Sequence, residues 1–408
     1  MLDDVDGGSM KQSIVLVILL ATLTITSSMA GCLFNDDDTN SDKVTAVFSY
    51  SPNQNMKQNE TINFDASSSL PNDGSLTYRW DFDGDNAVDK TGKTPSWSYT
   101  NTGDYDVTLT VSDGNTDSQL TKTITILGAD AIPPSADPGE VWAEVDCDDE
   151  DSPTQSAKDK YLYYICEDKG ENDREIDAST NVMLDASESE AGNSQAYISQ
   201  WSWDLDVNTD SDGDGDPEND EDATGETHEW KNIIPGEYEL SLKVKNSEGM
   251  IDMVSFKVYV NYVGIWEDFN QPANTSAGNA GGPGETWFDF TVTFDSDTGN
   301  TIKRTEVWLT YPKEDDDWIA GGSSDSNRNR LDLYVYNDTD EEVGNTSGIE
   351  LASRTYGDCS DENDCLEYSV SGSRMRSEFD DGDWTVKIYN GNYNDVQVVE
   401  FRILLTYK

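Results

Sequence analysis

Three short blocks of sequence occur twice in the same order, and this repeat constrains the fold more than any other feature of the chain. The first copy lies within residues 63–111 and the second within residues 183–244. NFDAS is answered by MLDAS, YRWDFD by WSWDLD, and GDYDVTLTV by GEYELSLKV. Three blocks that recur in one order indicate a repeated structural unit.

The last block of each copy alternates between apolar and polar residues. In GDYDVTLTV, the residues Tyr, Val, Leu and Val alternate with Asp and Thr. A period of two with β-branched and aromatic residues predicts a strand with one buried face. Gly103 and Gly236 precede these strands as turn residues. Short strands separated by Asn, Asp and Gly predict an all-β fold built from sandwiches.

The order FDAS, WDFDGD, GDYDVTLTVSD in residues 44–127 resembles the PKD domain, an immunoglobulin-like β-sandwich. Trp80 and Tyr105 stand where that family places core aromatic residues. Residues 175–261 resemble a more divergent copy, in which no Gly follows the WDLD block. The resemblance implies tandem immunoglobulin-like sandwiches of a non-catalytic kind, found on cell-surface proteins and secreted hydrolases.

Residues 264–408 form a different unit, which opens with the Gly-, Pro- and Asn-rich segment 270–285. Alternating strands follow, and in the last of them we expect one buried face made of Val399, Phe401, Ile403 and Leu405. The segments RLDLYVYNDTDEE and GDWTVKIYN resemble the pre-peptidase C-terminal domain and the related P-domain jelly rolls of secreted peptidases. This resemblance implies a jelly-roll-like β-sandwich that accompanies enzymes rather than being one.

The amino terminus predicts export. An apolar run of 12 residues, IVLVILLATLTI, has the length of a signal-peptide core and is followed by SSMAGC. That sequence resembles a lipobox, which implies a signal peptide over residues 1–31 and a lipid on Cys32; the alternative is an ordinary signal peptide with a spare cysteine. Met10 is a better start than Met1, because it removes three Asp residues from the region before the apolar run. Residues 32–43 predict an acidic tether.

The remaining cysteines form an even set of four, which allows three pairings. Proximity in the sequence favours Cys147 with Cys166 and Cys359 with Cys365, and export permits both bonds. Four reduced thiols are the alternative. The first pair falls within residues 128–174, which we expect to be a linker.

Charge and histidine content exclude several classes of function. The chain has 82 Asp and Glu against 26 Lys and Arg, a formal net charge of -56, so a nucleic-acid partner is not expected. Its single histidine, His228, leaves no candidate for a Ser/His/Asp triad or a HExxH zinc site.

An insertion at 208–222 of the second copy carries a candidate calcium loop. Its sequence fits D-x-D-x-D-G-x5-E, whose spacing can place oxygen ligands around one hard cation. Pro217 and the strand-like flanks depart from the helix-loop-helix form, and the alternative is a solvated acidic insertion. The shorter acidic turn with Asp81, Asp83, Asp85 and Asp89 is part of the family pattern and is not expected to bind metal. The predicted calcium ligands are Asp210, Asp212, Asp214, Asp216, Glu218 and Glu221.

Two kinds of surface site are also predicted. Trp308 is the best candidate for a glycan contact, because Val307, Leu309 and Tyr311 would take the buried side of its strand; packing in the core or at its rim is the alternative. The sequons give candidate N-glycosylation sites at Asn59, Asn274, Asn337 and Asn345.

Together these features predict a non-catalytic lipoprotein on the outer face of the cell membrane. It would act in adhesion or in binding of extracellular polysaccharide or a surface protein, with calcium stabilising the second sandwich. The alternative is an accessory or degenerate subunit of a secreted peptidase or glycosidase.

Overall fold

The computed structural model describes residues 43–145, 147, 161–211, 217, 220–274, 284–293, 300–314 and 328–407. These residues form two compact units. The first contains the residues up to Ser51, Thr61–Trp97 and Asp104–Ile124, and the second contains the rest. Strands dominate both units, so the all-β fold class is confirmed.

The first unit is a sandwich of two antiparallel sheets with seven strands. Its core is aromatic: the ring centroids of Phe64 and Phe82 lie 4.8 Å apart, and those of Phe48 and Trp80 lie 5.1 Å apart. Trp80 is fully buried, whereas Tyr105 is only half-buried. One sheet has the order β1 (Ser49–Ser51), β2 (Ile62–Asp65), β5 (Ser96–Trp97), and the other β4 (Lys90–Thr91), β3 (Thr77–Asp81), β6 (Gly103–Ser112), β7 (Asp117–Ile126).

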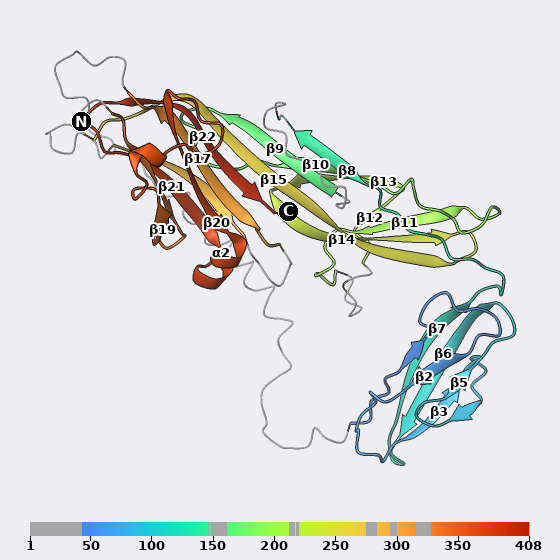
Figure 1. Ribbon diagram of the computed structural model, residues 1–408. Coiled ribbons are helices and arrows are strands. Elements are labelled where there is room, and N and C mark those ends of the chain that lie inside the picture. Colours follow the sequence, from blue (N-terminus) through green and yellow to red (C-terminus); the bar gives the residue numbers. More distant parts are fainter. Residues whose placement is uncertain are drawn as a thin grey trace, which may run out of the picture. The chain divides into compact units, whose positions relative to one another are not determined.

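A single strand of 21 residues, β15 (Ile251–Gln271), runs through the second unit (Figure 1). Its first part pairs with β14 (Gly236–Asn246) as far as Val260, and its second part pairs with β22 (Val396–Thr406) from Tyr262 onwards. Both ladders are antiparallel. The boundary predicted between residues 261 and 264 therefore falls inside one continuous strand.

The first part of β15 belongs to the second sandwich of the repeat. In the large sheet it continues through β14 to β11 (Ile198–Asp204) and β12 (Ala223–Thr224), while β10 (Thr180–Asp185) pairs with β13 (Thr227–Ile233) in a separate sheet. Leu240, Leu242 and Val244 on β14 are fully buried, as the alternation predicted. Trp203 is fully buried like its counterpart Trp80.

The prediction that residues 128–174 form a linker is wrong. β9 (Tyr161–Lys169) pairs in parallel with β15 over Val258–Trp266, and β8 (Val141–Val145) pairs in parallel with β9. The hydroxyls of Tyr161 and Tyr163 accept hydrogen bonds from the backbone N–H groups of Asp185 and Met183, at 3.0 and 3.1 Å. These bonds tie β9 to β10, so the segment is part of the sandwich.

The second part of β15 belongs to the C-terminal sandwich. Four strands of the nine-stranded large sheet and a separate four-stranded sheet make the jelly-roll-like arrangement that was expected. The helix α2 (Gly372–Glu378) and a short 3-10 helix, Leu351–Ser353, lie between strands, and no helix of the described residues is long and apolar enough to cross a membrane. One sheet has the order β15, β22, β17 (Arg304–Pro312), β20 (Asn363–Ser371), and the other β16 (Glu285–Val292), β21 (Gly382–Asn390), β18 (Leu331–Tyr336), β19 (Glu342–Asn345).

The buried face expected for β22 is correct for Phe401, Ile403 and Leu405 but wrong for Val399. Val399 is 36% exposed, and Val398 is buried instead. The ladder skips Val399 and Asp268, between the pairs Glu267–Glu400 and Phe269–Val398. The φ of 50° at Asp268 interrupts the extended backbone of β15 there. Period-two alternation fails at this point because the partner strand is locally kinked.

Both predicted disulfides are present. Cys147 is bonded to Cys166 with their Cα atoms 4.8 Å apart, and Cys359 is bonded to Cys365 with their Cα atoms 5.8 Å apart. The first links β9 to the residues just after β8, and the second closes a turn before β20. Bonds of this kind persist in oxidising compartments, which fits an exported protein.

Removing the first disulfide should destabilise the chain more than removing the second. The bonds close loops with sequence separations of 19 and 6 residues, and the loop-entropy relation gives about 3 and about 2 kcal/mol. We expect the double variant Cys147→Ser/Cys166→Ser to unfold at lower urea concentration than Cys359→Ser/Cys365→Ser. Equal or reversed midpoints under non-reducing conditions would contradict this order.

Candidate functional site

The outer face of the sheet β16, β21, β18 carries an unusual set of side chains. Strand alternation sends Phe288, Val386 and Val335 into the core, where all three are buried. The intervening residues point outward, and the register aligns Trp287 with Lys387 across the first two strands. Lys387 is in turn aligned with Tyr334 on the third strand. Residues far apart in the sequence are thereby brought into one row.

Four aromatic rings surround the ammonium group of Lys387, and we call Trp287, Tyr334, Tyr336 and Tyr389 the aromatic platform. The Lys387 Nζ atom lies 5.1 Å from the ring centroid of Trp287 and 4.7 Å from that of Tyr334. It lies 5.2 Å from Tyr336 and 6.0 Å from Tyr389. These distances are within the range of cation–π attraction, so the lysine holds the rings together from the centre of the platform.

The charge on Lys387 is stabilised in this position. Its side chain is only 12% exposed, and its Nζ atom lies 3.4 Å from Glu285 Oε1. Burial alone lowers the pKa of Lys387, but the hydrogen bond to Tyr336 and the charge of Glu285 raise it above its usual value. The positive charge of Lys387 in the platform is therefore balanced by the neighbouring carboxylate of Glu285.

The rings remain accessible from outside. Trp287 is 41% exposed, and the three tyrosines are half-buried. The rings of Trp287 and Tyr336 lie 5.6 Å apart, and those of Tyr334 and Tyr389 meet edge to face at 6.1 Å. The Asn274 side chain donates a 2.8 Å hydrogen bond to the Tyr389 hydroxyl. Several aromatic rings exposed together on one face are a feature typical of binding surfaces.

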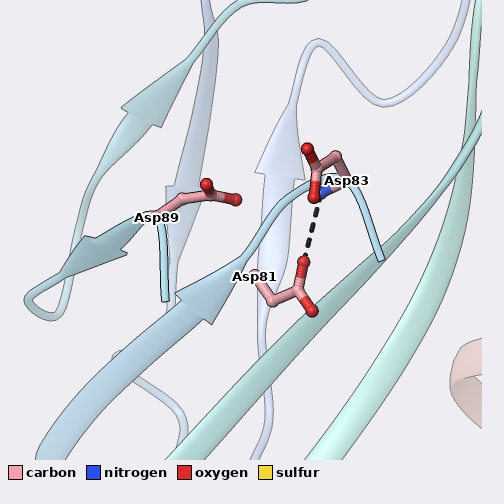
Figure 2. A group of neighbouring side chains, drawn as sticks. All are labelled: Asp81, Asp83 and Asp89. Carbon is pink, nitrogen blue, oxygen red and sulfur yellow. Dashed lines mark hydrogen bonds between the residues drawn. The ribbon is translucent and has the colours of Figure 1, made fainter. Parts of the chain in front are cut away.

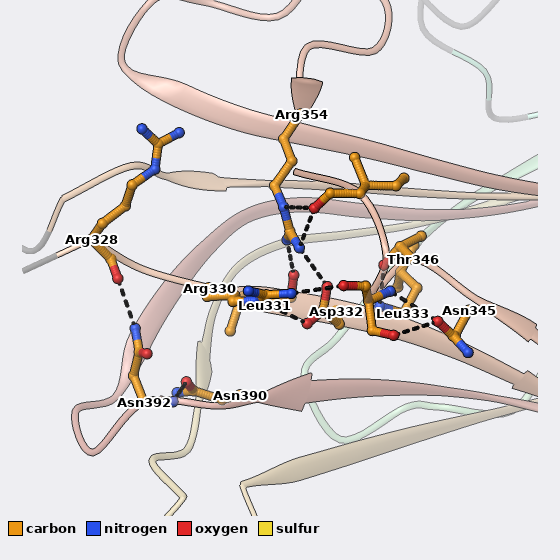
Figure 3. Close-up of polar contacts among 12 residues, drawn as sticks. Arg328, Arg330, Leu331, Asp332, Leu333, Asn345, Thr346, Arg354, Asn390 and Asn392 are labelled. Atoms are coloured by element: carbon orange, nitrogen blue, oxygen red, sulfur yellow. Dashed lines mark hydrogen bonds and ion pairs between the residues drawn. The ribbon is translucent and has the colours of Figure 1, made fainter. Parts of the chain in front are cut away.

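A buried arginine fixes the strand that carries two of these tyrosines (Figure 3). Arg354 is fully buried and donates to Asp332 Oδ1 at 2.6 Å, to the Tyr311 hydroxyl at 2.7 Å and to the Leu331 carbonyl. Because Leu331 and Asp332 begin β18, these bonds set the position of Tyr334 two residues later. An arginine fork supplies several fixed donors at once, which makes it suited to this task.

Chemically, the platform suits ligands with flat apolar faces and hydroxyl groups. Rings present such faces at low entropic cost, and neighbouring polar groups can bond hydroxyls. Glu285, Thr385 and Asn345 are among the polar neighbours on this sheet face. Sugar rings have this combination of apolar faces and polar rims.

Trp308, the predicted glycan contact, lies on the other sheet. Val307, Leu309 and Tyr311 are buried as predicted, and Trp308 is half-buried on the outer side of β17. Its ring lies 5.7 Å from that of Tyr356. It therefore forms a two-ring patch that is separate from the aromatic platform.

Of the other tryptophans in residues 264–408, Trp266 and Trp384 are fully buried and Trp318 lies outside the described residues. The signal for the platform was present in the sequence, since Tyr334, Tyr336, Lys387 and Tyr389 occupy the outward positions of strands whose inward residues are apolar. What the sequence lacked was the register that brings these strands together.

Most of the predicted calcium loop lies outside the described residues, namely Asp212, Asp214, Asp216 and Glu218. At its ends, Asp210 is exposed, and Glu221 accepts hydrogen bonds from Gln200 Nε2 at 2.9 Å and from the Ser202 hydroxyl. Cys32, the signal peptide and the tether lie outside the described residues as well. These assignments remain predictions.

In the acidic turn of the first sandwich, Asp81, Asp83 and Asp89 bring carboxylate oxygens within 4.8 Å of one another (Figure 2). Asp81 caps the turn, because its Oδ1 accepts from the Gly84 N–H at 2.8 Å and its Oδ2 from the Asn86 N–H at 2.7 Å. The backbone therefore already uses this carboxylate, which agrees with a structural role.

The sequons differ in accessibility. Asn59 is exposed in a turn. Asn337 is 5% exposed, and its Oδ1 accepts from the backbone N–H of Glu341 at 2.7 Å, so glycosylation at Asn337 is not compatible with this fold. Asn345 is half-buried and donates to Glu342, and Asn274 contacts Tyr389 as described above.

Comparison with known families identifies the first unit. The family model described as PKD domain matches residues 44–127, the range expected from the repeat. These residues are a PKD domain. PKD domains are typically non-catalytic, and the PKD domain and the two disulfides together indicate an extracellular protein.

Several solved structures are similar to the chain at low sequence identity. A carbohydrate-binding module of the β-sandwich superfamily is 15% identical, with 90% of this chain and 98% of that one covered, at a TM-score of 0.20. The Bacteroides ovatus surface protein SGBP-B, solved with a mixed-linkage heptasaccharide, is 9% identical over 90% and 97% of the two chains, at a TM-score of 0.17. Fibronectin(III)-like modules of Clostridium thermocellum CbhA are 12% identical over 53% and 95%, at a TM-score of 0.23. No curated protein matches the chain.

Replacing the central lysine tests how the platform is held together. Lys387→Met removes the cation from four rings and leaves Glu285 without its partner, so we expect a loss of about 1–2 kcal/mol in the free energy of unfolding. Lys231→Met is the matched control, since Lys231 is 62% exposed and pairs only with Glu229 among the described residues; it should cost less than about 0.5 kcal/mol. Urea unfolding measures both, and equal effects would show that the rings do not depend on the lysine.

Proposed function

We propose that this chain is a non-catalytic, exported protein that binds neutral extracellular polysaccharide on the aromatic platform of its C-terminal sandwich. The observation that carries the proposal is the row of outward rings around Lys387, with Trp287 41% exposed at its edge. Rings of this kind stack on the apolar faces of sugars, while the polar side chains beside them bond hydroxyl groups.

Charge around the platform favours a neutral ligand over an acidic one. Asp289 and Asp383 lie on the same sheet face, and burial together with the charge of Asp383 raises the pKa of Asp289. Lys387, the cation at the centre, already faces Glu285. An acidic polysaccharide would meet these carboxylates and the net charge of -56 on the whole chain, and like charges in a contact are costly.

In the same proposal, the lipid on Cys32 attaches the mature chain to the outer face of the membrane. The PKD domain and the second sandwich then lie between the anchor and the C-terminal sandwich in the order of the chain. A single lipid chain gives only marginal membrane binding, so stable attachment requires a second chain or further contacts.

The function is tested with the chain from residue 33 onwards, which contains both compact units, in a pull-down on a panel of neutral and acidic insoluble polysaccharides. We expect retention on at least one neutral polysaccharide that survives high salt, because ring stacking is not screened by ions. Absence of retention on the whole panel would overturn the proposal, and retention on acidic members alone would overturn the ligand class.

The site is tested by Trp287→Ala, which should weaken binding about tenfold or more, since Trp287 is the most exposed ring of the platform and Trp is a common hot-spot residue. Trp308→Ala is the matched control, because Trp308 is half-buried on the outer side of the opposite sheet. Dissociation constants from affinity electrophoresis decide the matter. If Trp308→Ala weakens binding and Trp287→Ala does not, the patch of Trp308 and Tyr356 is the binding site instead.

A further inference from the structure

A buried carboxylate in the second sandwich has no counter-charge. Asp204, the last residue of β11, is 1% exposed. Three other buried acids of the chain contact a cation: Glu237 lies 2.6 Å from Lys257, Asp332 lies 2.6 Å from Arg354, and Asp364 lies 2.8 Å from Arg328. Asp204 forms no ion pair within the described part of the chain. Burying an unpaired charge is expensive, so this exception requires a physical explanation.

One oxygen of Asp204 is left without a hydrogen bond. Its Oδ1 accepts from the Asp206 N–H at 3.0 Å, but its Oδ2 is buried and has no partner among the residues that the structure describes. Three further acids surround it, namely Asp206, Asp220 and Asp222. Burial, as the largest cause, and the charges of these three acids together raise the pKa of Asp204 to about 6.

The neighbouring acids are held in place by the backbone. Asp222 Oδ2 accepts from the Leu205 N–H at 2.8 Å, and the Asp222 N–H donates to the Trp203 carbonyl at 2.9 Å. Asp220 is 2% exposed and accepts from the Ser211 N–H. Asp206 before the insertion and Asp220 and Asp222 at its end thus lie near the last residue of β11.

The aspartate at the equivalent position of the first sandwich has hydrogen bonds to both of its carboxylate oxygens. Asp81 corresponds to Asp204 in the repeat, and both of its oxygens accept backbone hydrogen bonds. Phe82 N–H donates to Asp89 at 2.7 Å, just as Leu205 N–H donates to Asp222. The framework is therefore shared, and the second sandwich differs in having one buried oxygen free and an insertion after it.

We propose that Asp204 is a ligand of a bound divalent cation of the calcium class, with Asp206, Asp220 and Asp222 supplying further oxygens. A hard cation takes six to eight oxygen ligands, and carboxylates with water can complete that number. Among the described residues, three acidic oxygens lie within 4.8 Å of one another only in the first sandwich. Binding at Asp204 would therefore require the exposed Asp206 side chain to turn towards it, while Asp222 keeps its bond from the Leu205 N–H through Oδ2 and offers its Oδ1. The site is distinct from the D-x-D-x-D-G motif and independent of the aromatic platform.

Calcium titration of the chain from residue 33 onwards tests the site. We expect a dissociation constant of about 10⁻⁴ to 10⁻³ M by calorimetry, as in extracellular modules. The melting temperature of the second unit should rise by at least about 3 °C in ~10 mM calcium, because the ion binds only the folded chain. Asp204→Asn should abolish the rise, and Asp206→Asn, at an exposed position, should weaken binding at least tenfold. Asp81→Asn is the matched control and should leave the rise unchanged.

Two outcomes would overturn the proposal. One is a calcium effect that survives in both Asp204→Asn and Asp206→Asn, which would place the ion elsewhere. The other is no calcium effect in the wild-type chain, together with a gain of stability on acidification that Asp204→Asn lacks. A pKa raised from 3.8 to about 6 gives stability that is present at low pH and lost as the pH rises through about 6, so this second result would show that a proton neutralises Asp204 instead.

Discussion

The backbone ladder on both halves of β15 is the constraint on which the second unit depends. One strand supplies the partner for β14 at one end and for β22 at the other, and β9 runs beside it in parallel across the junction. Because strands of one sheet share a continuous twist, the two sandwiches inherit their relation from the hydrogen bonds of a single element. Their core is continuous too, extending from Trp203 to Trp384.

The same strand supports the aromatic platform from beneath. Trp266 on β15 packs edge to face against Phe288 on β16 at 4.9 Å, and Phe288 lies 4.3 Å from Phe401 on β22. Phe288 follows Trp287 in the sequence, so the residue that fills the core and the residue that faces outward are fixed together. On β18, the bond from Arg354 to Asp332 fixes the strand that carries Tyr334 and Tyr336. The outer rings are thus positioned by the inner layer.

Local pattern predicted what depends on neighbouring residues in the chain. Alternation gave the buried faces of β6, β14 and β17, the repeat gave the first two sandwiches, and spacing gave both disulfides. It could not give what depends on partners distant in the sequence. β8 and β9 were taken for a linker because the parallel pairings of β8 with β9 and of β9 with β15 leave no local signature. Val399 was misplaced because the kink lies in the opposite strand. The platform was missed for a related reason, since Trp287 and Tyr334 meet only through β21.

The sharing of β15 also limits how the protein can be divided. A fragment that begins near residue 262 would carry β22 and the second part of β15 but lose β14, whereas one that ends there would lose β22. Either fragment would leave a cut strand end and would interrupt the ladder between β9 and β15, exposing unpaired backbone groups that favour association with other chains. We therefore expect residues 128–407 to be duplicated, lost or exchanged together in evolution. The smallest part of this region that can be moved intact is the pair of sandwiches, not a single sandwich.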